Sequence, residues 1–165
     1  MPQIAVSELL YLMDNAFQTS RAHSLLSNLG TVTEADYARD HEGRSIREMV
    51  RHVAAAKHVY DNQAFGDASL FMPSFQSRIY ESKATMAEDL EWLRHGYEQL
   101  RTSVAALDDG GLSTPRPVHM GGTLPTRQII SIMVEHDLYH AGEINHLRAL
   151  MQDTDYWRGR EPATR

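Results

Sequence analysis

Residues 129–151 read IISIMVEHDLYHAGEINHLRALM, and this stretch decides the fold. An α-helix advances about 100° per residue, so side chains three and four positions apart share one face. With Ile129 at zero, the side chains within roughly 40° of it form one mostly apolar stripe. They are Ile129, Met133, His136, His140, Glu143, Leu147 and Met151. The stripe predicts an amphipathic helix over about residues 124–151.

Three earlier segments have the same helical periodicity, over about residues 7–29, 45–64 and 83–107. The second begins with a capping box, in which the side chains of Ser45 and Glu48 bond to each other's backbone N–H groups. No segment alternates convincingly as a β-strand does. Four amphipathic helices of this length predict an all-α four-helix bundle. The periodicity leaves its topology open between up-and-down and crossover arrangements.

The stretches between these helices contain turn residues and predict loops at 31–44, 66–82 and about 108–123. A chain of 165 residues fits one domain. We therefore expect a single bundle over residues 1–151 and a loosely ordered C-terminal tail over residues 152–165.

Composition narrows the possible functions. The net charge of -6 argues against a nucleic-acid or anionic-membrane surface, because both need clustered positive charge. No apolar run approaches the roughly 18 residues of a membrane span, so we expect a cytoplasmic protein. The absence of cysteine excludes disulfides, thiolate metal ligands and a cysteine nucleophile. The one unusual feature of the composition is its number of histidines, which is nine.

Three polar side chains lie in the middle of the apolar stripe, namely His136, His140 and Glu143. Polar groups in a core must be paired or must bind a ligand. His136 and His140 are one helical turn apart, a spacing at which two imidazoles can chelate one divalent cation. The alternative is a pair of core histidines that hydrogen-bond to the helix backbone or to tyrosines.

A third ligand has to come from another helix. His52 is the best candidate because it lies at the edge of the apolar arc of the second helix. His23 can approach the core from the first helix, and His119 can reach over a cavity mouth from the loop before the last helix. His58 points the other way, on the side of Arg51, and we expect it to be solvated.

Two known metal motifs nearly fit the last helix. The zinc-protease pattern HExxHxxGxxH fails because Asp137 replaces the general-base Glu and the glycine comes one residue early. A di-iron carboxylate bundle needs two ExxH units, and the chain has only the one formed by Glu143 and His146. The sequence therefore disfavours both a zinc-protease site and a di-iron site.

A His in the second helix followed by His136-x-x-x-His140-Ala-Gly-Glu143-Ile-x-x-Leu147-Arg148 resembles the DinB-like (DinB/YfiT) family of metal-binding four-helix bundles. That family includes the bacillithiol and mycothiol S-transferases. The resemblance implies that His52, His136 and His140 are the metal ligands. It also implies crossover connections, a homodimer, and a divalent metal, zinc or nickel first and manganese or iron next. Position 143, often Gln in the family, is Glu here.

Three neutral imidazoles on one divalent ion leave a position open for water or substrate. We therefore expect a metal-dependent enzyme that acts on a small molecule, by thiol S-transfer or by hydrolysis. Because the chain has no cysteine, the thiol would be a low-molecular-weight cofactor. The alternative is a non-catalytic, metal-binding stress or damage-inducible protein.

Further residues are expected around the metal. Glu143 can orient a ligand, act as general base or bind the metal, or it can simply pair with an arginine or tyrosine. The other candidates for the pocket lining are His23, Tyr60, Tyr97 and His119.

Overall fold

Three of the four predicted helices are long, continuous helices. They are α4 (Ile46–Phe65), α6 (Met86–Ala105) and α7 (Thr126–Gln152). The computed structural model describes residues 4–154 and confirms the all-α bundle. The expected tail lies, from residue 155 on, outside the described residues. Among the described helices, none has both the length and the apolarity that a membrane span requires.

The first predicted helix is broken, so the prediction of one continuous helix over residues 7–29 was wrong. Helix α1 (Val6–Asp14) runs into a π-helical turn (Asn15–Thr19), and α2 (Leu25–Leu29) begins after a bend. Two serine side chains explain the break. The Ser20 hydroxyl accepts a hydrogen bond from the His23 N–H (3.2 Å), and the Ser24 hydroxyl accepts one from the Ser27 N–H (3.3 Å). Serine hydroxyls thus replace the helix carbonyls as partners of these N–H groups.

Two of the predicted loops contain helix. Short α3 (Glu34–Tyr37) lies in the first, while a 3-10 turn (Met72–Phe75) and α5 (Gln76–Glu81) lie in the second. Both segments are too short to develop a visible periodicity in the sequence. The loop predictions were therefore wrong at these positions.

The connection before α7 contains a small two-stranded antiparallel sheet, which was not predicted from the sequence. Strand β1 (Pro115–Pro117) pairs with β2 (Thr123–Pro125) after the 3-10 turn Gly110–Ser113. Gly121 and Gly122 turn the chain with φ of 90° and 79°, values that favour glycine. Strands of three residues cannot display an alternating pattern.

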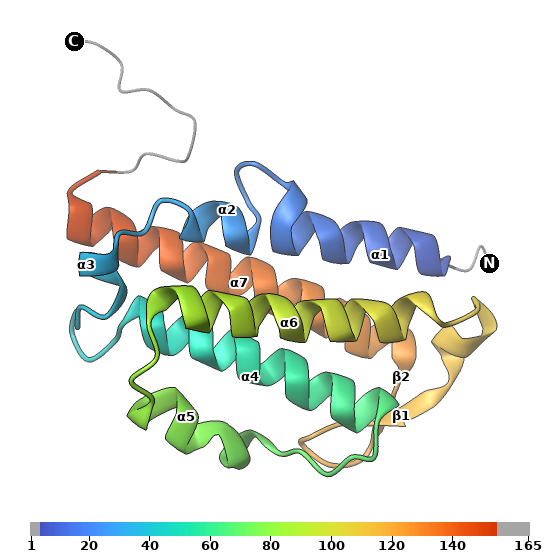
Figure 1. Cartoon of the computed structure of the whole chain (residues 1–165). Helices are drawn as coiled ribbons and strands as arrows, with labels where there is room; N and C mark the ends of the chain where they lie inside the picture. Colours follow the sequence, from blue (N-terminus) through green and yellow to red (C-terminus); the bar gives the residue numbers. More distant parts are fainter. Residues whose placement is uncertain (1–3, 155–165) are drawn as a thin grey trace.

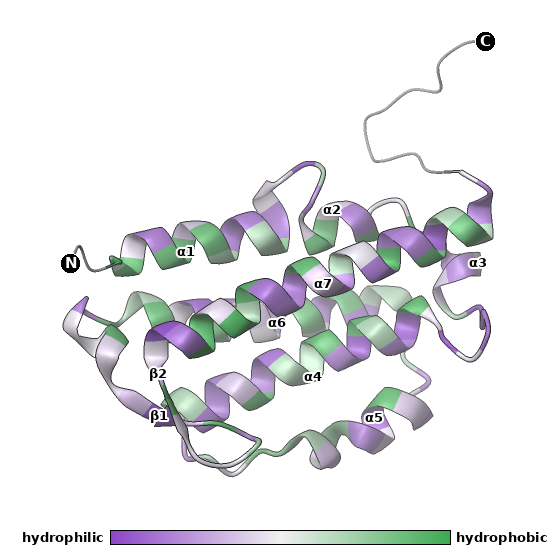
Figure 2. Cartoon of the chain, turned by 180° about the vertical axis from the view of Figure 1, so that it is seen from behind, coloured by the Kyte–Doolittle hydropathy of each residue, from purple (hydrophilic) through white to green (hydrophobic). Residues whose placement is uncertain are grey.

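The topology contains one crossover, between α4 and α6. Figure 1 shows α4 and α6 running in the same direction and α7 running the opposite way, while α1 and α2 follow one another beside α7. Because α4 and α6 are parallel, residues 66–85 must return along the length of α4, and α5 packs on α4. In Figure 2, hydrophobic residues (green) and hydrophilic residues (purple) are interspersed along α4 and α7, as is typical of amphipathic helices.

A buried arginine anchors this crossover. Arg51 on α4 is completely buried. Its Nε donates to Asp89 Oδ2 on α6 (2.7 Å), and its Nη atoms donate to three carbonyl oxygens of the crossover, those of Ile79, Ser82 and Ala84 (3.0–3.2 Å). The expectation that His58, on the same side of α4, is solvated was wrong, because its side chain is partly buried, with its ring stacked on Trp92 at 5.5 Å between centroids.

A second buried ion pair joins α4 to α7. Lys57 Nζ donates to both carboxylate oxygens of Asp137, at 2.7 and 2.8 Å. The rings of Phe17 and Tyr97 stack on each other, and the ammonium lies 4.9 Å from the Phe17 centroid. Both charges are thus removed from water and satisfied by each other.

Replacing Asp89 with Ala leaves the Arg51 guanidinium buried without a carboxylate. We expect the free energy of unfolding to fall by about 3–5 kcal/mol, as happens when one partner of a buried ion pair is removed. Urea denaturation followed by circular dichroism measures the change. Glu91→Gln, at an exposed position of α6, is the matched control and is expected to change stability by less than about 0.5 kcal/mol. Equal stability of the two variants would contradict the role given to the ion pair.

Candidate metal centre

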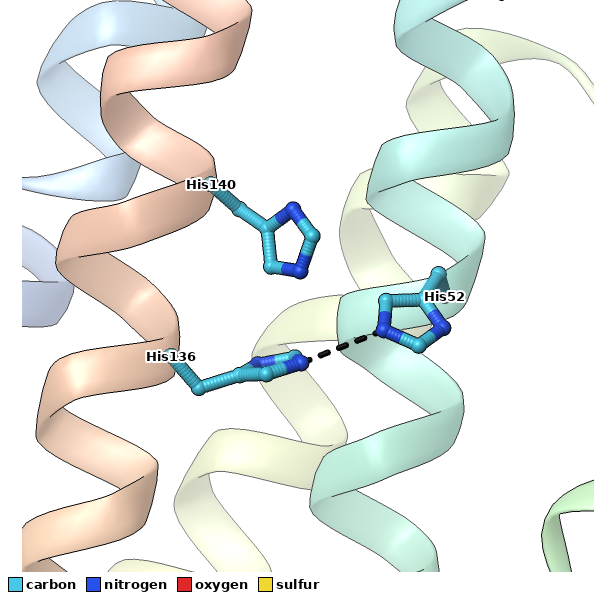
Figure 3. A group of neighbouring side chains, drawn as sticks. All are labelled: His52, His136 and His140. Carbon is cyan, nitrogen blue, oxygen red and sulfur yellow. Dashed lines mark hydrogen bonds between the residues drawn. The ribbon is translucent and has the colours of Figure 1, made fainter.

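Three histidines from two helices converge between α4 and α7 (Figure 3). His52 comes from α4, and His136 and His140 come from successive turns of α7. Each histidine offers one ring nitrogen, and these nitrogens lie within 4.8 Å of one another. The Nε2 atoms of His52 and His136 are 3.2 Å apart, and Figure 3 shows a nitrogen of His140 directed toward them.

The donor set fits a divalent transition metal. Zinc binds imidazole nitrogen at about 2.0–2.1 Å, so two nitrogens on one tetrahedral ion lie about 3.3 Å apart. The 3.2 Å separation of the two Nε2 atoms matches that value. Without a metal, the same contact is a hydrogen bond for which one ring must be protonated at Nε2. The three rings can therefore hold one ion with small side-chain adjustments.

The electrostatics keep all three imidazoles neutral, which is the form that binds metals. Burial lowers the pKa of His52 and of His140. Burial also lowers the pKa of His136 to about 3, with a further contribution from the neighbouring charges of His140 and His52. At neutral pH the ring lone pairs are thus free of protons and available to a cation.

Glu143 lies beside the candidate ligand His140, at the ring nitrogen Nδ1. Its Oε2 is 2.8 Å from Nδ1 of His140, although this contact lacks the alignment of a good hydrogen bond. Its Oε1 accepts from Nη1 of Arg44 (3.0 Å) and from the Tyr139 hydroxyl (3.1 Å). The carboxylate favours a proton on Nδ1 of His140 and leaves Nε2 for the metal. Of the roles considered for Glu143, these contacts support orientation of a ligand and pairing with an arginine and a tyrosine.

A cavity of about 410 Å³ opens beside the histidines. His52, His140 and Glu143 line it from the bundle helices, together with Met49 and Tyr139. Ile79 and Tyr80 complete the wall from α5. Neither residue was predicted for the site, because residues 66–82 contain turn residues and predict a loop. Only the capping and periodicity of α5 could have indicated them, and the helix is too short to display either.

The other residues expected to line the pocket do not line this cavity. His119 is half-buried, and its ring meets the buried Tyr60 edge-on at 4.9 Å between centroids. Neither His119 nor Tyr60 is among the residues that line the cavity beside the three histidines. Tyr97 is buried against Phe17 and donates to Asp14, and His23 is exposed beside a separate cavity on the far side of α7. Neither Tyr97 nor His23 lines the cavity beside the three histidines.

A family model described as the DinB superfamily matches residues 16–144, which include all three histidines and Glu143. A search of curated proteins finds no match to the chain.

Replacing His136 and His140 with Ala removes two of three ligands, so we expect metal binding to be lost. The wild-type protein, purified without a histidine tag or metal column, should contain about one equivalent of a divalent transition metal per chain by elemental mass spectrometry. His146→Ala, at an exposed position on the same helix, should retain it. Undiminished metal in a folded double variant would disprove the ligand assignment.

Replacing Glu143 with Gln removes the charge beside Nδ1 of His140 without adding bulk. We expect the variant to keep about one equivalent of metal but to bind it about 10- to 100-fold more weakly, the usual effect of losing an outer hydrogen-bond partner. Competition with a chromophoric chelator measures the affinity, and Glu135→Gln, exposed on the same helix, is the control. Complete loss of metal would instead make Glu143 a direct ligand.

Proposed function

The chain belongs to the DinB superfamily, and we propose that it is a metal-dependent enzyme that transfers a small-molecule thiol to an electrophilic substrate. The observation that supports this most is the cluster of three imidazoles, two of which, His52 and His140, line a cavity. Three protein ligands on one divalent ion leave a coordination position open for substrate, as in catalytic zinc sites.

A divalent ion in this site would supply a Lewis acid that keeps a thiol in its nucleophilic thiolate form at neutral pH. The chain itself contains no cysteine, so the thiol has to be a separate small molecule. In the transfer, the thiol sulfur forms a bond to the electrophilic carbon. The leaving group departs with the electron pair, and the thiol proton passes to solvent.

The carboxylates around the cavity favour thiol transfer over hydrolysis. Hydrolysis gains from a free general base beside the attacking water. Among the described residues that line the cavity, the carboxylates are Glu48 and Glu143. Glu48 accepts hydrogen bonds from Ser45 in the capping box, and Glu143 is held by Arg44, Tyr139 and His140. A thiolate nucleophile needs no such base.

The test is a panel of small thiols and alkylating electrophiles, with zinc-loaded protein and product formation followed by mass spectrometry. We expect one thiol to react faster with the wild-type protein than in buffer. The rate should fall to the uncatalysed value in the His136→Ala/His140→Ala variant and in protein stripped of metal. His146→Ala should remain active. A protein that holds its metal but accelerates none of these reactions would favour the alternative, a non-catalytic metal-binding bundle.

A further inference from the structure

One cationic side chain reaches the cavity beside the three histidines. Within the described part of the chain, Arg44 is the only lysine or arginine among the cavity-lining residues. It follows α3 and immediately precedes Ser45, the N-cap of α4. It also borders a second cavity of about 280 Å³, which shares Met49 and Glu143 with the first. Arg44 therefore borders two neighbouring cavities.

The backbone of Arg44 is held in a tight turn. His41 and Arg44 exchange two backbone hydrogen bonds, of 2.8 and 3.1 Å. The two residues between them, Glu42 and Gly43, have φ of 52° and 82°, the left-handed values that a two-residue type I′ turn requires. Glu42 adopts a conformation that residues other than glycine rarely take. The turn thus presents the arginine from a defined position.

The side chain of Arg44, by contrast, is weakly held. It is 69% exposed, and among residues 4–154 its ion pair is the contact with Oε1 of Glu143. An ion pair with so exposed a guanidinium contributes little to stability, because water competes for the arginine charge. Glu143 keeps the Tyr139 hydroxyl and the His140 ring as neighbours when the arginine leaves. Arg44 can therefore exchange Glu143 for another anion at little cost.

We infer that Arg44 binds the carboxylate of a carboxylate-bearing thiol whose sulfur faces the three histidines. This inference rests on the proposed function and specifies the class of thiol. A guanidinium matches a carboxylate with two parallel hydrogen bonds, which a neutral amide cannot accept in the same way. The apolar parts of Met49 and Ile79 cover the ligand between its two polar ends. The ligand carboxylate takes the place of Glu143 as the partner of Arg44.

The experiment uses the full-length protein loaded with Co²⁺, whose absorption changes when sulfur binds. The probes are mercaptoacetate and 3-mercaptopropionate, each compared with its neutral amide. We expect the wild-type protein to bind at least one acid about ten-fold or more tightly than its amide, the effect of a charge-assisted hydrogen bond. In Arg44→Gln this preference should disappear, while the amide binds as before. Arg44→Lys should keep part of the preference, and Arg127→Gln, at an exposed position on α7, should keep all of it.

The outcomes separate this inference from the proposed function. Equal binding of acids and amides by the wild-type protein, or a preference that survives in Arg44→Gln, would overturn the role of Arg44 and leave thiol activation intact. A uniform loss of affinity for acids and amides in Arg44→Gln would reduce Arg44 to a partner of Glu143. If wild-type protein takes up no Co²⁺, or if no thiol changes its spectrum, both the inference and the proposed function fail.

Discussion

The buried ion pair of Lys57 and Asp137 fixes how α4 lies against α7, and the candidate metal centre depends on that arrangement. Asp137 directly follows His136, and Lys57 lies little more than one helical turn beyond His52. If one helix slipped along the other, two charges would be buried without partners, at a cost of several kcal/mol. Apolar contacts alone tolerate such slips more easily because they have no fixed direction. The ion pair thus keeps imidazoles from two helices within reach of one ion.

The bundle and the histidine cluster could be predicted because both follow from periodicity. Apolar residues repeat over many turns of α4, α6 and α7, so their existence and approximate ends are visible in the sequence. His136 and His140 interrupt an apolar stripe, and a core admits polar groups only when they are satisfied. The same reasoning indicated His52 on the facing helix.

The remaining features could not be predicted because their partners are far apart in the sequence. Arg51 bonds to groups 28–38 residues away, and without them an arginine on a helix is expected in solvent. The contact of Arg44 with Glu143 spans 99 residues. The break in the first helix depends on serine hydroxyls that compete with the backbone, and serine also occurs in uninterrupted helices. Such features emerge only when the whole chain is packed.

The crossover that brings α5 against α4 has a consequence for how such a protein can diversify. The candidate ligands stand on long helices whose positions the core determines, whereas Ile79 and Tyr80 stand on a six-residue helix at the surface. Short connecting segments tolerate substitution and insertion better than core helices do. The candidate metal ligands and one wall of the cavity are therefore encoded by separable parts of the chain. Substitutions in residues 76–81 can reshape that wall while the three histidines keep their positions on the core helices.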